Sequence, residues 1–338
     1  MNPFRRDIEQ QTSALMHFVE AYRRPAAMER IGDFRPRRIV LTGMGASFHA
    51  ALWGSQVLQS LGIWAIALES SELLHFGSLL LKDADSVVLI SQSGTSAEVL
   101  PLLDRIPASA HVFGLTNNAD SLLARRAGTH LDIVAGNETT VACKTYLNTL
   151  ACLWLVAHLW TGAKPEKPIS DLAAVAGRVA ALTGDARAIG ATWCDSLLGL
   201  DKIVFTGHGP HVPTARQGAM MMGEWMKRQA VGTGIGAFRH GLIEFTDATT
   251  GVVVLGAGGT TATSVDLLTR ELRSFGATVL NLVEGRLTGT ELAEEREVDE
   301  FLSAFLDVVP MQIFVETAAR RLGIEPNFRH ISKVIASI

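Results

Sequence analysis

Four hydroxyl groups and one amide are concentrated in a stretch of six residues, Ser91-Gln92-Ser93-Gly94-Thr95-Ser96. An apolar run, Val87 to Ile90, precedes this stretch, and an amphipathic pattern begins at Ala97. The pattern predicts a buried strand, a tight loop and the N-terminus of a helix. The exposed N–H groups and the dipole of a helix N-terminus attract anions, and hydroxyls add hydrogen bonds. Because the loop has no Lys or Arg, it suits a phosphate ester recognised by geometry.

An ordinary helix cap in a serine-rich turn is the structural alternative. One hydroxyl would satisfy that alternative, whereas the loop carries four. We therefore expect a phosphate site. Its predicted ligand-binding residues in this loop are Ser91, Gln92, Ser93, Thr95 and Ser96.

The segments around this loop alternate between strand and helix patterns, which is typical of an α/β fold with a parallel sheet. A helical segment is expected over residues 1–30, and a tight turn over residues 43–47 leads into a helix from Phe48 to Leu61. The predicted strands cover residues 38–42, 63–68, 87–90, 111–115 and 130–133.

The strand-and-turn pattern then recurs, which indicates a duplicated α/β domain. Ile203 lies 164 residues after Ile39 in matching segments, and Val252 to Gly259 match Val87 to Gly94 at an offset of 165. The second copy has Gly256-Ala257-Gly258 in place of the hydroxyls, so one strong phosphate site is expected. The predicted domains are a helical segment (1–34), a first α/β domain (35–165), a helical linker (166–200), a second α/β domain (201–322) and a C-terminal tail (323–338).

The composition is typical of a soluble globular protein: 338 residues, 48% hydrophobic and 19% charged, with a net charge of −4. This acidity argues against nucleic acid as a partner. The three cysteines have no metal or redox spacing, which predicts reduced thiols in the cytoplasm. The start of the chain has no apolar signal-peptide core, and the longest apolar stretch, 147–160, is too short for a membrane span and predicts a buried helix.

The motifs quoted above resemble the sugar isomerase (SIS) domain family, as two tandem domains. They resemble most the isomerase half of glucosamine-6-phosphate synthases and the stand-alone amino-sugar-6-phosphate deaminases and isomerases. The resemblance implies two three-layer, flavodoxin-like or Rossmann-like domains that bind a phosphosugar without a cofactor or metal. It also implies binding roles for the turn Gly45-Ala46-Ser47 and for Thr140 and Ala142. Near Ala142 the family's Val-Ala-x-Thr-Lys motif is altered, with Cys143 or a one-residue shift in place of Thr.

The same resemblance implies three catalytic residues: Glu224, His240 and Lys333. Glu224 lies sixteen residues before the His240-Gly241 pair, as in the synthases, and would move a proton between C1 and C2 of the sugar. His240 would open the sugar ring, and Lys333, in the tail, would orient the substrate or form a Schiff base. Without the family resemblance, these residues could equally be a solvated Glu, a structural His and a surface Lys.

Two departures from the family concern the chemistry. The family's Lys before the catalytic Glu is replaced by Met221, within Met220-Met221-Met222, of which two are expected to be core residues. The glutaminase part of the synthases is not expected in this chain, so it would not produce ammonia from glutamine. The resemblance therefore predicts a hexose or hexosamine 6-phosphate isomerase or deaminase, a homodimer in which His240 reaches the partner's site.

Two other functions remain open. A sugar-phosphate sensor would bind without turnover, although no helix-turn-helix segment precedes Arg38. A nicotinamide-dependent dehydrogenase is a remote alternative, because Gly43-x-Gly45 lacks the third glycine of the dinucleotide fingerprint even though Glu69 ends the second strand. His208 and His211 have no neighbouring carboxylate or Cys in the sequence, so a metal site is not expected there.

Overall fold

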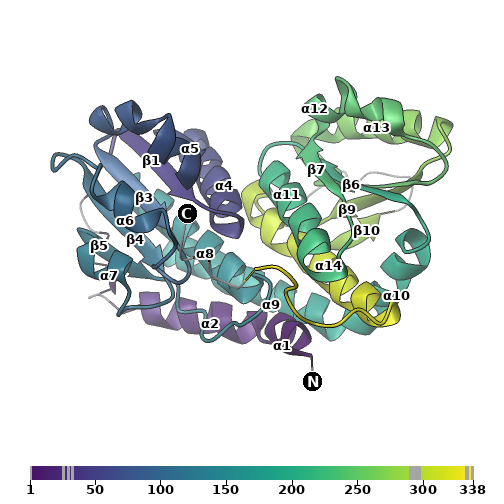
Figure 1. Ribbon diagram of the computed structural model, residues 1–338, viewed down its shortest axis with the longest axis horizontal. Helices are drawn as coiled ribbons and strands as arrows, with labels where there is room; N and C mark the ends of the chain where they lie inside the picture. The colour runs from purple at the N-terminus through teal and green to yellow at the C-terminus, as the bar shows by residue number, and fades with distance from the viewer. Residues whose placement is uncertain are drawn as a thin grey trace. The chain divides into compact units, whose positions relative to one another are not determined.

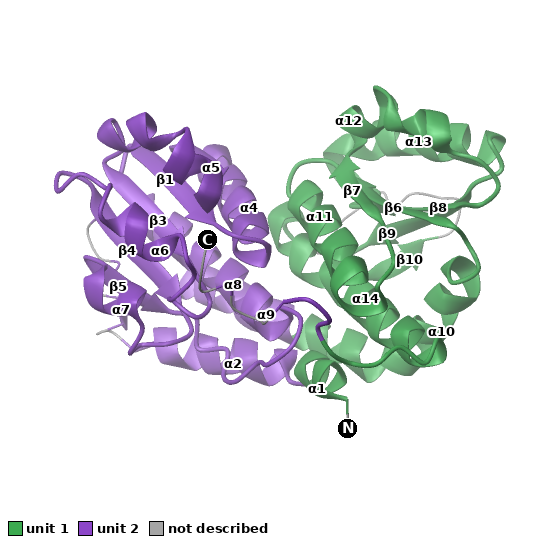
Figure 2. Ribbon diagram, viewed as in Figure 1, with its two compact units in different colours: residues 1–9, 177–327 green, residues 10–176, 328–338 purple. Residues whose placement is uncertain are grey.

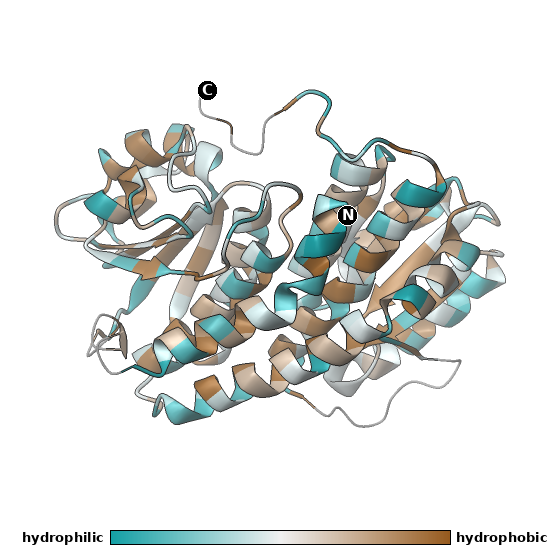
Figure 3. Cartoon of the chain, turned by 90° about the horizontal axis from the view of Figure 1, so that it is seen from below, coloured by the Kyte–Doolittle hydropathy of each residue, from teal (hydrophilic) through white to brown (hydrophobic). Residues whose placement is uncertain are grey.

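The computed structural model describes residues 2–24, 27–28, 31, 34–288, 298–331 and 335. The chain forms two compact units, shown in Figure 2: unit 1 comprises Met1–Glu9 and Gly177–Asn327, and unit 2 comprises Gln10–Ala176 and Phe328–Ile338. Most helices carry both hydrophilic and hydrophobic residues along their length, as Figure 3 shows, which is the pattern of helices that cover a core on one side.

Unit 2 contains a five-stranded sheet in the order β2-β1-β3-β4-β5, and every neighbouring pair is parallel (Figure 1). The parallel sheet predicted for the first α/β domain is thus confirmed. The strands are β1 (Arg38–Gly43), β2 (Trp64–Glu69), β3 (Ser86–Ile90), β4 (His111–Thr116) and β5 (Thr129–Asp132). The chain leaves β1 for β2 on one side and then returns to β3 on the other. Such a reversal opens a crevice at the carboxyl ends of β1 and β3, where ligands bind in open α/β sheets.

Helices of unit 2 cover this sheet and leave β3 buried along its whole length. The predicted buried helix is confirmed as α8 (Lys144–Trp160), in which every residue except His158 is buried. A helix that is apolar around its whole circumference must be surrounded by protein, so α8 forms the core of this unit. The other helical elements are α2 (Gln11–Tyr22), α4 (Ala46–Ser60), α5 (Ser70–His75), η1 (Ser78–Lys82), α6 (Val99–Leu103) and α7 (Leu122–Arg126).

Unit 1 has a sheet with a related order, β10-β9-β8-β6-β7, but it is mixed rather than parallel. The prediction of a parallel sheet in the second domain was therefore wrong at one edge. Glu284 and Gly285, at φ 50° and 79°, join β9 to β10, and a two-residue turn with two positive φ angles makes an antiparallel hairpin. The strands are β6 (Lys202–Gly207), β7 (Val231–Gly234), β8 (Thr250–Leu255), β9 (Thr278–Val283) and β10 (Arg286–Thr288).

The long helix α14 (Glu300–Arg321) forms the core of unit 1 and packs against α10 (Ala186–Leu197) and α11 (His211–Met221). Among the described residues it alone has the length and hydropathy of a membrane span, and 94% of its most apolar window is buried in the unit, as in a core helix. The other helical elements of unit 1 are α1 (Pro3–Glu9), η2 (Met222–Met226), α12 (Ile235–Arg239), η3 (Leu242–Phe245), η4 (Gly259–Thr261) and α13 (Ala262–Ser274). Helix α9 (Glu166–Gly184) has residues in both units.

Several predicted boundaries differ from the structure. The N-terminal helical segment is divided into α1 and α2 at Gln10, rather than continuous. The helix after β1 begins at Ala46, two residues before the predicted start, because Gly45 takes a positive φ of 52° and turns the chain there. The helix after the serine-rich loop begins at Val99, two residues later than predicted.

Asn148 of α8 ties three segments of unit 2 together, and we predict that its replacement by Leu destabilises the unit. Its buried side-chain amide donates to the backbone oxygens of Ala14 in α2 at 3.0 Å and Ile133 after β5 at 2.8 Å. Asn148→Leu keeps the branching and the number of heavy atoms but removes both hydrogen-bond donations, so the free energy of unfolding should fall by about 1–3 kcal/mol. Urea unfolding measures this change. Asn137→Leu, at an exposed position of the same unit, is the control, and equal losses in the two variants would contradict the assignment.

Candidate functional site

The serine-rich loop follows β3 at the crevice of unit 2, and its backbone is held by the neighbouring strand end. Ser91 N donates to Leu115 O at 3.0 Å. Gln92 O accepts from Thr116 Oγ1 at 3.1 Å and from Asn117 N at 2.9 Å. Because these bonds use groups that face the protein, the loop is fixed before any ligand arrives.

The hydroxyls of the loop fall into two groups. Ser91 is 3% exposed; its Oγ lies 2.9 Å from Ser96 Oγ and accepts from Gly94 N at 3.1 Å, so this hydroxyl shapes the loop. Ser93 Oγ accepts from both the amide and the hydroxyl of Thr95 at 3.2 Å. Ser93 and Ser96 are half-buried and Thr95 is exposed. Among the described residues, the amides of Gln92, Ser93 and Ser96 have no hydrogen-bond acceptor, so they are available to an anion.

Gly94 is required by both its conformation and its surroundings. Its φ is +66°, in the left-handed region, and a Cβ there would lie 2.1 Å from Ser121 Oγ. Its carbonyl accepts from Leu123 N at 3.1 Å. No residue with a side chain fits this position without movement of the loop or of Ser121.

The predicted turn Gly45-Ala46-Ser47 lies at the same edge of the sheet. β1 and β3 are neighbours, with Thr42 opposite Leu89, so the segments that follow them end side by side. Gly45, Ala46 and Ser47 are half-buried at the start of α4. The amide end of this helix therefore opens toward the crevice beside the serine-rich loop.

The segment that contains Thr140 and Ala142 is connected to the loop through Asn117. The Asn117 side chain accepts from Ala135 N at 2.9 Å and donates to Gly136 O at 2.7 Å. The backbone N–H of Asn117 donates to Gln92 O. Thr140 is buried and Ala142 is half-buried. The structure thus links this segment, the loop and the turn at residues 45–47 along one edge of unit 2.

Glu138 organises the end of this segment where α8 begins. Its buried carboxylate accepts from Cys143 N at 3.0 Å, from Thr145 N at 3.2 Å and from the Thr145 hydroxyl. A carboxylate at a helix N-terminus satisfies unpaired amides and complements the helix dipole. The amides of Cys143 and Thr145 are therefore already occupied, and Glu138 is a positioning residue that the sequence reasoning missed.

The C-terminal tail reaches the serine-rich loop. Ala97 N, at the end of the loop, donates to Ile335 O at 3.0 Å. The predicted catalytic Lys333 lies outside the described residues. Ile335, which is described, belongs to unit 2 together with the loop.

Glu224, the predicted base, lies in unit 1 on η2, a π-helical turn directly after α11. Such turns are rare and are often found at functional sites. Glu224 is half-buried, whereas Met221 and Met222 are fully buried and Met220 is half-buried, so the expected core role of two of the three methionines is confirmed. Met221 thus contributes packing where the family has a Lys.

Lys227 is a residue near Glu224 that the sequence reasoning missed. It adopts a left-handed conformation with φ 56° at the end of η2, which is uncommon for a residue with a side chain. Its ammonium donates to Glu224 O, and to Asn327 O at 2.8 Å. A positive charge is thereby fixed within the turn that carries Glu224, and no spacing in the sequence signals that conformation.

His240 follows α12 and is exposed. Its imidazole has no hydrogen-bond or ion-pair partner within the described parts of the chain, so Glu224 and His240 are not joined directly in unit 1. The other two histidines singled out have separate partners: His208 Nε2 lies 3.0 Å from Ser264 Oγ, and His211 lies 3.0 Å from Asp307. Burial lowers the pKa of His208. The described residues contain no cluster of three His, Cys, Asp or Glu side chains that could hold a metal.

Residues 34–159 match the family model described as the SIS domain. The matched segment covers less than half of the chain. It contains the whole sheet of unit 2, the serine-rich loop and most of α8. The prediction of two tandem SIS domains is confirmed for the first copy only, because the matched region ends before unit 1 begins to form its sheet.

Similar proteins include enzymes of sugar-phosphate metabolism. A glutamine–fructose-6-phosphate aminotransferase (isomerizing) from Thermococcus kodakarensis is 29% identical over 304 residues, which cover 86% of this chain and 50% of that protein. The chain thus spans about half the length of the curated relatives it matches. A glucosamine-6-phosphate deaminase structure from Thermotoga maritima has a TM-score of 0.77 at 24% identity, covering 98% of this chain and 99% of that one. A tagatose-6-phosphate ketose/aldose isomerase structure from Escherichia coli has a TM-score of 0.80 at 18% identity, covering 97% and 95%. The two structures show a shared fold.

We predict that Gly94→Ala lowers the affinity for a hexose 6-phosphate by at least tenfold. The added methyl group must displace Ser121 or the loop, and loss of one charge-assisted hydrogen bond is worth about 1.5–3 kcal/mol. Titration calorimetry measures the affinity. Gly62→Ala is a matched control, because Gly62 also has a positive φ, +82°, but has nothing within 4 Å of the added Cβ. The control should show only the strain, about 1–2 kcal/mol of stability. Unchanged affinity in Gly94→Ala would exclude the loop as the binding site.

Proposed function

We propose that this protein is a sugar-phosphate isomerase or deaminase acting on a hexose or hexosamine 6-phosphate. The observation that supports this most is the serine-rich loop at the crevice between β1 and β3, in a segment that matches the SIS domain model. It carries several hydroxyls and three amides that have no acceptor among the residues that the structure describes. A phosphate has oxygens on every side, so a loop of converging N–H and O–H donors recognises it without a cation. The names of the similar proteins indicate the same substrate class.

Within this proposal, Ser93, Thr95, Ser96 and the amide of Gln92 bind the phosphate, and Ser91 holds the loop in shape. Gly45, Ala46 and Ser47 approach the ligand from the end of β1. Thr140 and Ala142 line the same edge. Lys333, two residues before Ile335 in the sequence, orients the sugar or reacts with its carbonyl group.

Glu224 is proposed as the base that moves a proton between C1 and C2. It is the only acidic residue between Asp201 and Glu244, and its half-buried position allows the carboxylate to meet a substrate. His240 is proposed to open the sugar ring, because neutral imidazole can accept one proton and donate another. Its exposure, and the fact that no described residue pairs with it, support a role toward another copy of the chain, in a homodimer, rather than toward its own Glu224.

With Met221 in the core, Lys227 is the cation placed nearest to Glu224 along the chain. Its ammonium donates to two backbone oxygens and so stabilises the π-helical turn. We therefore do not assign to Lys227 the role of the family's Lys. The proposed reaction therefore depends on Glu224 as the proton carrier. A deaminase would release ammonia after that proton transfer, and an isomerase would not.

Solvent deuterium tests the reaction. A base that carries the C1–C2 proton exchanges it with water, so wild-type protein with its hexose or hexosamine phosphate in D₂O should place deuterium at C1 or C2. Glu224→Gln keeps the shape but accepts no proton, and incorporation should fall about a hundredfold or more. Phosphosugar affinity should stay nearly unchanged, because the phosphate loop lies in unit 2.

NMR of the recovered sugar and an ammonia assay read the result. Ammonia release identifies a deaminase, and incorporation without release identifies an isomerase. Full activity in Glu224→Gln would exclude Glu224 as the base. Binding of a sugar phosphate by the wild type without any turnover would favour a sensor.

The proposed homodimer makes a separate prediction. Glu224→Gln and His240→Ala chains should each be inactive alone, but mixed dimers should contain one site with both native residues and recover partial activity. Subunit exchange is verified by mass spectrometry of differently tagged chains, and activity is then measured. Mixed dimers that remain inactive would show that one chain supplies both residues of a site.

A further inference from the structure

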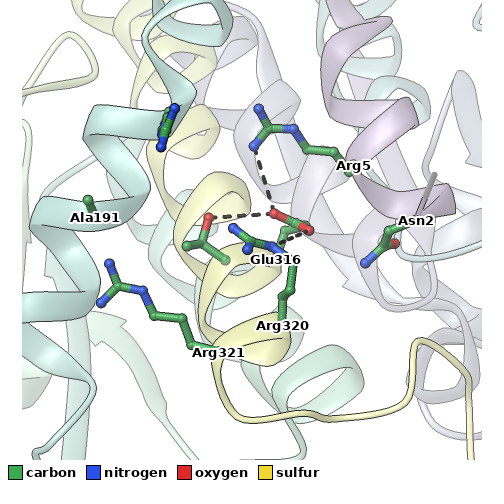
Figure 4. Close-up of a pocket in the computed structure, with 8 residues that line it drawn as sticks. Asn2, Arg5, Ala191, Glu316, Arg320 and Arg321 are labelled. Carbon is green, nitrogen blue, oxygen red and sulfur yellow. Dashed lines mark hydrogen bonds and ion pairs between the residues drawn. The ribbon is translucent and has the colours of Figure 1, made fainter.

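Unit 1 contains a pocket, formed by α1, α10 and α14, that the proposed reaction does not use (Figure 4). Its volume is about 710 Å³, within the range of small-molecule sites. The lining residues are Asn2, Arg5, Arg187, Ala191, Glu316, Thr317, Arg320 and Arg321. Four arginines from three helices thus surround one cavity.

The helices meet closely beneath this pocket. A Cβ on Gly190 of α10 would lie 2.4 Å from Thr317 Oγ1 of α14, so only glycine permits this approach. Arg320 and Arg321 lie in the last turn of α14, where the helix dipole favours cations. That dipole does not explain Arg5 of α1 or Arg187 of α10, which bring their charges to the same cavity from other helices.

The carboxylates around the pocket leave part of this positive charge unused. Arg5 Nε pairs with Glu9 at 2.8 Å, and Arg321 pairs with Asp195 at 2.7 Å. Arg187 has no ion pair or hydrogen bond with any described residue. Each guanidinium has five N–H donors, and the observed bonds use few of them.

Glu316 lies at the centre of the arginines in Figure 4 and is 2% exposed. Its carboxylate oxygens are 3.8 Å from Arg5 and 3.8 Å from Arg320, beyond hydrogen-bond distance. Burial raises the pKa of Glu316. This carboxylate attracts the two arginines electrostatically without accepting a hydrogen bond from either.

We propose that this pocket is a binding site for a small polyanion, a molecule with two or more phosphate or carboxylate groups. Guanidinium groups bind such oxygens through pairs of parallel hydrogen bonds. A single phosphate needs no more than one or two of them, whereas four arginines around 710 Å³ fit a ligand with separated negative groups. The ligand would contact α1, α10 and α14 together.

This site differs in chemistry from the serine-rich loop of unit 2. The loop contains no Lys or Arg and presents amides and hydroxyls, so its recognition depends on geometry. The pocket of unit 1 presents full charges. Its affinity should therefore fall steeply as ionic strength rises, because added salt screens the exposed arginines.

Calorimetry with pyrophosphate and with citrate tests the proposal. One probe carries phosphate oxygens and the other carboxylates, so the two titrations identify the preferred group. Each of Arg187→Gln and Arg320→Gln should weaken binding of the preferred probe about tenfold, and the double variant more. Both residues are exposed, so the fold should persist, which circular dichroism checks. Arg273→Gln, an exposed arginine of α13 away from the pocket, is the matched control.

A Ser91→Ala/Ser93→Ala variant distinguishes binding at the pocket from binding at the serine-rich loop. This variant should bind the probe as the wild type does. Loss of binding in that variant together with unchanged binding in Arg187→Gln/Arg320→Gln would overturn the proposal. So would equal weakening in Arg273→Gln, or the absence of binding of either probe at millimolar concentration. The result does not depend on turnover, so it stands or fails independently of the proposed reaction.

Discussion

A loop at the end of a parallel strand can bind a ligand only if its own buried polar groups are already paired with protein. In unit 2 this condition is met by Thr116, the last residue of the neighbouring strand β4, and by Asn117, which follows it; both donate to Gln92 O. Asn117 then holds the segment that leads to Glu138, and Glu138 caps α8. The backbone donors of Gln92, Ser93 and Ser96 have no acceptor within the described part of the chain. The candidate site is therefore a consequence of how the edge of the sheet satisfies its backbone.

In unit 1 the corresponding edge of the sheet is occupied by core side chains. Gly256 replaces the start of the hydroxyl-rich loop, and a Cβ there would lie 2.2 Å from the ring of His211. His211 is buried with Ser303 Oγ at 3.3 Å and Asp307 at 3.0 Å. The carboxylate of Asp307 also accepts from Gly285 N at 2.8 Å in the β9–β10 turn. A Ser, a His and an Asp lie together here, but all three are completely buried and therefore belong to the core. The sequence feature behind the expectation of a single phosphate loop, the loss of the hydroxyls in the second copy, thus corresponds to an edge filled with core side chains.

The features visible in the sequence were those that depend on local pattern. Buried strands, the glycine turns and the apolar helix α8 follow from periodicity and composition, which neighbouring residues largely determine. The hairpin at Glu284 and Gly285 was missed because a charged residue with positive φ is not a turn signal. The π-helical turn at Glu224 and the left-handed Lys227 were missed for a similar reason: the tertiary contacts with Asn327, one hundred residues away, fix that conformation. Glu138 was missed because its capping bonds depend on the path of the segment after β5.

The two candidate sites of this chain would recognise anions by two different physical mechanisms. Around Gly94 the discrimination is geometric, because uncharged donors are useful only when several meet the same oxygens at hydrogen-bond distance. Around Glu316 it is electrostatic, because exposed guanidinium groups attract any nearby anion and distinguish ligands by the number and spacing of their charges. A neutral loop suits a substrate that must leave after reaction, since no ion pair has to be broken for release. Four arginines suit a ligand whose occupancy follows its concentration.

Phe4 of α1, adjacent to Arg5, contacts Trp225 with ring centroids 5.2 Å apart, and Trp225 follows Glu224 in the π-helical turn. The pocket and the proposed base are thus connected through one packed aromatic pair within the same unit.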